Sequence, residues 1–152
     1  MALKPVPRQP DFTIDKEEWG RILLEDNSII DLRFILLDLI ITGEDILGPQ
    51  VTLGHVIGIR LRSPPELMER VKDKPLTPET PPPLTKDAGY EAVGIKKVEK
   101  PTRSSYYFEE HALMVELSIG TAARNMNYRS PNGGPLYNIR WTLKYNVSKA
   151  KV

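Results

Sequence analysis

Proline divides this chain into segments that can join a β-sheet and segments that cannot, because its ring leaves no backbone N–H for the ladder. Of the 152 residues 14 are proline, roughly twice the usual share of ~5%. Three lie within the first ten residues and seven lie between positions 64 and 83. The other four border apolar segments, at Pro49, Pro101, Pro131 and Pro135. The long apolar segments are therefore clear of proline, which favours strands.

Six of these segments alternate between apolar and polar residues, as strands with one buried face do. They span residues 19–24, 29–41, 50–62, 90–99, 105–119 and 136–147. No β–α–β rhythm accompanies them, which argues against a parallel sheet. The sequence predicts a mainly β fold, either an antiparallel β-sandwich or a partly open β-barrel of about six strands with one short helix.

The last segment is the clearest strand. Its alternation predicts one buried face, formed by Tyr137, Ile139, Trp141, Leu143, Tyr145 and Val147. The second half of segment 29–41 is apolar on both faces, which predicts a central strand covered on both sides.

The short helix is expected after Ser63, which can cap it, with Pro64 at its first position and Pro75 beyond its end. The remaining prolines indicate two extended appendages. We expect an arm over residues 1–12 and a single β-rich domain over 13–152, interrupted by a proline-rich excursion at 74–89.

Composition excludes several classes of site. The chain has no cysteine, so disulfides, thiolate zinc sites, iron–sulfur clusters and a cysteine nucleophile are ruled out. No apolar run approaches the ~20 residues of a membrane helix, and the N-terminus has no secretory signal pattern. We expect a cytoplasmic protein without cofactors or membrane contact. The proline-loaded connections and lack of cysteine also favour a thermophilic source.

The net charge of +1 conceals an asymmetry. Residues 1–93 carry 11 Lys and Arg against 16 Asp and Glu, a net −5, and residues 94–152 carry 10 against 4, a net +6. Folding can intermix the two halves, or it can produce a basic face opposite an acidic one. The second arrangement favours head-to-tail association or an anionic partner.

A metal-dependent enzyme is one functional hypothesis. His55 and His111 are the only histidines, and alternation along a continuous strand would place Glu109 and His111 on one face. Such a pair can bind a divalent metal, although a solvated polar edge has the same pattern. No Gly-x-Ser-x-Gly motif indicates a serine nucleophile.

Single-stranded nucleic-acid binding is a second hypothesis, since aromatic rings can stack on bases while Arg and Lys contact phosphates. The basic, aromatic C-terminal third supplies the candidate residues. They are Tyr106, Tyr107, Arg124, Arg129, Arg140 and Lys144.

The leading hypothesis is a non-enzymatic structural or assembly protein, a homo-oligomer or a subunit in a complex with other proteins. Stiff proline-rich segments lose little entropy when they dock, and exposed sheet edges invite pairing. The alternative is that the arm is a flexible tail and the excursion is a loop packed on its own domain. The candidate contact residues are Pro5, Pro7, Pro10, Pro81, Pro82 and Pro83.

Overall fold

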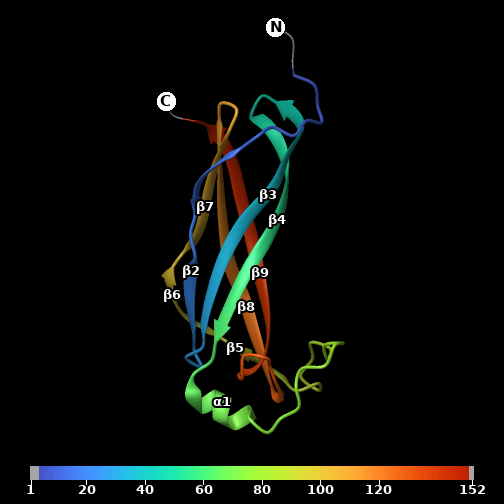
Figure 1. Cartoon of the computed structure of the whole chain (residues 1–152), viewed down its shortest axis with the longest axis vertical. Coiled ribbons are helices and arrows are strands. Elements are labelled where there is room, and N and C mark those ends of the chain that lie inside the picture. The colour runs from blue at the N-terminus through green and yellow to red at the C-terminus, as the bar shows by residue number, and fades with distance from the viewer. Residues whose placement is uncertain (1–3, 151–152) are drawn as a thin grey trace.

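The computed structural model describes residues 4–150, which form nine strands and one short helix (Figure 1). The elements are β1 (Thr13–Glu17), β2 (Gly20–Leu24), β3 (Ile29–Asp45), β4 (Gly48–Arg62), α1 (Pro65–Val71), β5 (Tyr90–Val93), β6 (Ile95–Lys100), β7 (Thr102–Phe108), β8 (His111–Arg129) and β9 (Pro135–Lys149). Among these residues, no helix has the length and apolar character needed to cross a membrane.

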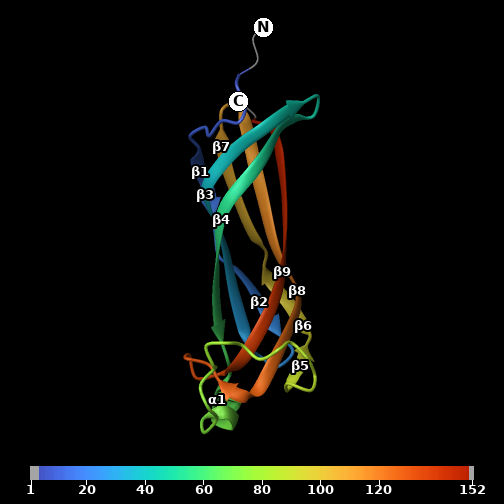
Figure 2. The same ribbon diagram turned by 90° about the vertical axis from the view of Figure 1, so that its right-hand side faces the viewer.

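The strands form two antiparallel sheets that do not close into a barrel. One sheet has four strands in the order β4-β3-β2-β6. The other sheet has five strands and is built around β8. Strand β9 pairs with one edge of β8, and β7 and β5 pair with different parts of its other edge. Strand β1 pairs with β7. The hairpins β3–β4 and β8–β9 run along the molecule, which is strongly elongated (Figures 1 and 2). The predicted mainly β, antiparallel architecture with one short helix is confirmed.

The observed strand number exceeds the predicted number for three reasons. Strand β1 lies within a polar segment that shows little alternation. Segment 90–99 breaks at Gly94 into β5 and β6, which belong to different sheets. Segment 105–119 reverses at Glu109, where φ is 48°, so that Phe108 pairs with His111 across a tight turn.

The core lies between the sheets as two clusters placed end to end. Ile57 and Leu143 pack against both clusters and join them. One cluster contains Ile22, Leu24, Ile30, Leu32, Val93, Leu117, Ile119 and Ala122, and the other contains Phe34, Leu36, Leu39, Ile41, Tyr106, Phe108, Leu113 and Val115. Alternation along β3 and β8 thus supplies a continuous apolar stripe.

Two predictions of burial are wrong, each for its own reason. On β3, Leu37 lies in a bulge and is exposed, so this strand is not covered on both sides. On β9, Trp141 and Tyr145 are 39% and 47% exposed. Both side chains lie on the same face as the core residues of β9, as expected. They are nevertheless exposed, because β9 is an edge strand and no further strand lies beside it.

The helix begins two residues later than its predicted cap. Pro64 occupies the N-cap position and Pro65 the first turn, and no side chain caps the helix. The predicted cap at Ser63 is therefore wrong. Leu67 and Val71 are buried, so the short apolar face anchors α1 at one end of the sandwich (Figure 1).

Both proline-rich segments contact the sheets through backbone hydrogen bonds. In the arm, the Arg8 N–H donates to the Ile41 carbonyl at 3.1 Å, and the Ile41 N–H donates back at 2.8 Å. In the excursion, the Thr77 N–H donates to the Arg129 carbonyl at 3.0 Å, and the Arg129 N–H donates to the Pro75 carbonyl at 2.8 Å. The first three residues of the predicted arm lie outside the described residues.

A buried tyrosine hydroxyl connects the two sheets. Tyr106 on β7 donates to Glu17 Oε1 at 2.7 Å and accepts the backbone N–H of Leu36 on β3 at 3.2 Å. We predict that Tyr106→Phe lowers the free energy of unfolding by ~1–3 kcal/mol, since both partners lose a hydrogen bond in the interior. Urea denaturation measures this change. The matched control is Tyr107→Phe, whose exposed ring should leave stability unchanged; equal effects of the two variants would contradict the assignment.

Candidate functional site

The residues predicted to bind nucleic acid do not form one surface. Tyr106 is fully buried, so its ring is not available to stack on a base, and its assignment as a possible platform was wrong. Arg124 is occupied by Glu91, 2.6 Å from its Nε, and by Asp26, 3.2 Å from its Nη1. Arg129 lies beside α1, where it lines a hollow with Met68.

The other three residues share the face of the five-stranded sheet that is turned away from the core. Tyr107 pairs with Ala112, which pairs with Ser148 on β9. Because β9 continues regularly, Lys144 and Arg140 follow Ser148 on the same face. Only half of the predicted set therefore shares a surface.

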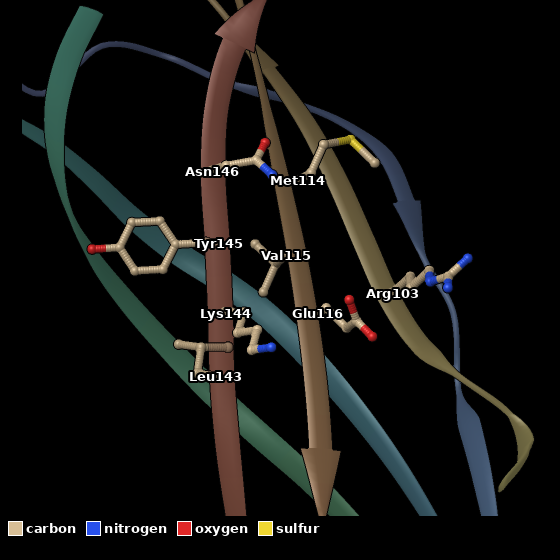
Figure 3. A pocket seen from close by; sticks show the side chains of 8 residues that line it. All are labelled: Arg103, Met114, Val115, Glu116, Leu143, Lys144, Tyr145 and Asn146. Atoms are coloured by element: carbon tan, nitrogen blue, oxygen red, sulfur yellow. The ribbon is translucent and has the colours of Figure 1, made fainter. Parts of the chain in front are cut away.

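Lys144 lines a hollow of about 670 Å³ on that outer face (Figure 3). Arg103, Glu116 and Lys144 form a row across β7, β8 and β9. In Figure 3 the side chains of Lys144 and Asn146 point to the opposite side from those of Leu143 and Tyr145. The negative Glu116 stands between two positive residues, which leaves the row a formal charge of +1 and weakens its attraction for an anion.

The arrangement proposed for a metal does not form. Glu109 lies in the β7–β8 turn, so it does not alternate with His111 along one strand. Its carboxylate accepts hydrogen bonds from Arg8 Nε and Nη2 at 3.1 and 2.9 Å, which lower the pKa of Glu109. His111 stacks on Phe108 at 5.4 Å. Within residues 4–150, no group of three or more acidic or histidine side chains could hold a metal ion.

The arm fastens the ends of the two sheets together at the β3–β4 hairpin. Besides Glu109, the Arg8 guanidinium contacts Glu44 on β3, with 2.5 Å between Arg8 Nη2 and Glu44 Oε1. One arginine thus connects the arm, the hairpin and the β7–β8 turn.

The tip of the β3–β4 hairpin is apolar and open to solvent. Ile46 is 100% exposed and Leu47 is 90% exposed. The turn is ordered by Asp45, whose carboxylate accepts the Leu47 N–H at 2.8 Å and the Gln50 side-chain amide at 3.0 Å. A hollow of about 370 Å³ adjoins the tip and is also lined by Glu110, His111 and Val147.

The prolines proposed as partner contacts lie at the surface. Pro5, Pro7, Pro81 and Pro83 are exposed, while Pro10 and Pro82 are half-buried. Leu76 and Leu84 of the excursion are also exposed. Both segments therefore present apolar side chains and proline rings to solvent.

Sequence reasoning missed a group of arginines on the outer face of the four-stranded sheet. Arg21, Asp31 and Arg60 lie in one row across β2, β3 and β4, and Arg62 lies two residues further along β4. Asp31 is 1% exposed. Its oxygens lie 2.8 Å from Arg21, 2.9 Å from Arg60 and 3.6 Å from Arg62. We call Arg21, Arg60 and Arg62 around Asp31 the arginine cluster.

No family model, curated protein or solved structure matches the chain.

The arginine cluster makes the free energy of unfolding depend on pH in the acidic range. Hydrogen bonds from Arg21, followed by those from Arg60, lower the pKa of Asp31 below its ordinary value of 3.8. The ionised carboxylate thus stabilises the fold above pH 3.8, and this contribution is lost as the pH falls towards the lowered pKa. We predict that Asp31→Asn is less stable than wild type at pH 7 and that the difference shrinks below about pH 4. Urea denaturation at several pH values measures it; a difference independent of pH would contradict the prediction.

The contacts of Arg8 predict that its removal loosens the arm. In Arg8→Gln, chymotrypsin should cleave faster after Phe12, since local opening exposes the chain to protease. Time-resolved mass spectrometry of the digest measures the rate. Lys4→Gln is the control because Lys4 is an exposed residue with a single 3.5 Å contact to Glu109. Equal rates in wild type and Arg8→Gln would show that Arg8 does not fasten the arm.

Proposed function

We propose that this chain is a non-enzymatic assembly protein that associates with a second copy of itself through the tip of the β3–β4 hairpin. The observation that carries the proposal is the exposure of Ile46 and Leu47 at this tip. Burying a large aliphatic side chain contributes about 1.5–3 kcal/mol, so burial of both side chains would contribute favourably to the free energy of association.

The surroundings of the tip favour a specific contact. The hairpin is fastened by Arg8, and its turn is ordered by Asp45, so docking would order few additional groups. Preorganised contacts lose less entropy on binding.

The hollow beside the tip favours a second copy as the partner. A two-fold interface needs one patch that is complementary to itself. The tip and the hollow lie at the same end of the molecule, so two copies related by a two-fold axis can each place Leu47 against the Val147 side of the other.

Sheet edges contribute less to the proposal. Strand β6 is an edge, and its exposed residues include Lys96, Lys97 and Lys100. Lysines along an edge oppose pairing with another strand. The proline-rich excursion is the second proposed contact, supported by the exposure of Leu76 and Leu84.

Nucleic-acid binding by the C-terminal third has weaker support. Tyr107, Arg140 and Lys144 share a face, but Tyr106 and Arg124 are occupied within the fold. An enzyme using His111 and Glu109 lacks the geometry on which it was based.

Size-exclusion chromatography with light scattering, over a series of concentrations, tests the proposal. Wild type should reach the mass of a dimer, and Leu47→Asp should shift the monomer–dimer equilibrium by at least ~100-fold towards monomer, because a buried unpaired charge costs several kcal/mol. Since Leu47 is in an exposed turn, the melting temperature of the monomer should not change.

Leu37→Asp is the matched control, since it places the same charge on an exposed leucine of β3 that lies outside the tip. It should dimerise as wild type does. A wild-type protein that remains monomeric at every concentration, or a Leu37→Asp variant impaired as much as Leu47→Asp, would refute association through the tip.

A further inference from the structure

The arginine cluster carries more positive charge than its folded partners neutralise. Three guanidinium groups surround the single carboxylate of Asp31, so these four side chains carry a formal charge of +2, of which the nearby Glu99 offsets part at Arg21. The side chains of Arg21, Arg60 and Arg62 are 39%, 55% and 54% exposed, so part of each guanidinium faces solvent.

A fourth arginine extends the positive surface. Arg33 follows Asp31 on the same face of β3 and lies opposite Gly58 of β4. The nearest carboxylate oxygen, on Glu17, is 3.7 Å from Arg33 Nη2, beyond the distance of a hydrogen bond. Arg33 Nε is buried and has no hydrogen-bond partner among the described residues. Its donors are therefore largely unused by the fold.

Trp19 holds these guanidinium groups in position. A Cβ at Gly58 would lie 3.3 Å from Trp19 Cη2, so the missing side chain lets the indole lie close against β4. The guanidinium carbon of Arg60 is 4.8 Å from the ring centroid, and that of Arg33 is 6.0 Å away. Contact with an aromatic face restrains an arginine and leaves its edge free to donate hydrogen bonds.

We propose that the arginine cluster, with Arg33 and Trp19, is a binding site for a phosphate group. Guanidinium groups match phosphate oxygens through paired N–H donors, and the negative charge of a phosphate complements the excess positive charge of the cluster. Asp31 accepts hydrogen bonds from Arg21 and Arg60, so that the remaining N–H groups of these two arginines are ordered before the ligand arrives. This site lies on the four-stranded sheet and is independent of the hairpin tip.

Arg62 is the residue most available to the ligand. Its closest approach to Asp31 is 3.6 Å, compared with 2.8 Å for Arg21 and 2.9 Å for Arg60. Arg62 can thus move towards a phosphate without breaking a short contact in the fold. Replacing it leaves Asp31 with two arginine partners, which makes Arg62→Gln the least disruptive test of the site.

The phosphate can belong to a small molecule or to a nucleic-acid backbone, which present the same oxygens to the arginines. Titrations with inorganic phosphate and with a short oligothymidylate distinguish these sources. In both, sodium chloride holds the ionic strength constant, because exposed charges are screened by salt.

The two tryptophans provide a direct measurement. Trp19 belongs to the proposed site, whereas Trp141 lies on β9 of the other sheet. In the ¹H–¹⁵N spectrum of the full chain, each indole N–H gives one signal. We expect the Trp19 signal to shift with saturation as inorganic phosphate is added, while the Trp141 signal stays in place.

Matched variants connect the shift to the arginines. Arg62→Gln should weaken phosphate binding by about tenfold or more, the effect of losing one charge-assisted contact. Arg140→Gln removes the same charge from the outer face of the other sheet and should bind as wild type does. The positions of the remaining signals report whether each variant is folded.

Three outcomes decide the proposal. A saturable, Arg62-dependent Trp19 shift with inorganic phosphate supports a site for a free phosphate group. The same shift with oligothymidylate alone supports a site for the phosphates of a backbone. No Trp19 shift with either ligand, or equal weakening by Arg62→Gln and Arg140→Gln, overturns it.

Discussion

The structure depends on one constraint, which is that each long hairpin can bury only one of its two faces. The inner faces of β3 and β8 meet in a continuous apolar stripe, and this contact holds the two sheets together along their length. The hydroxyl of Tyr106 adds a polar link across the same interior. Because burial of the inner faces supplies the main hydrophobic stabilisation, residues on the outer faces, the edges and the tip can serve in binding.

The proposed functions follow from this division. The tip of the β3–β4 hairpin extends past the stripe, so Ile46 and Leu47 have no partner in the fold. The outer face of the four-stranded sheet collects arginines, since alternation turns Arg21, Arg60 and Arg62 away from the core. The two surfaces lie on different parts of the molecule, and association and phosphate binding can therefore occur together.

The sequence predicted the sheets well and the surfaces poorly. Proline and alternation identified the β3–β4 and β8–β9 segments, since both signals are local. The turn at Glu109 was missed because Glu109-Glu110 contains no glycine, proline or asparagine to mark it. The arginine cluster was missed because Arg21, Asp31 and Arg60 come together only through strand register. The exposure of Trp141 likewise depends on β9 being an edge, which strand order decides.

The row formed by Arg21, Asp31 and Arg60 also favours one register between β3 and β4. Part of β3 is apolar on both faces, so hydrophobicity alone discriminates weakly between two registers that differ by one residue. Such a slip of β4 would place Ile59 or Leu61 opposite Asp31 and leave the buried carboxylate without Arg60. The loss of the Asp31–Arg60 ion pair therefore raises the free energy of the slipped register. Because the β3–β4 ladder is hydrogen-bonded along its length, fixing the register at this one position fixes it for the rest of the hairpin.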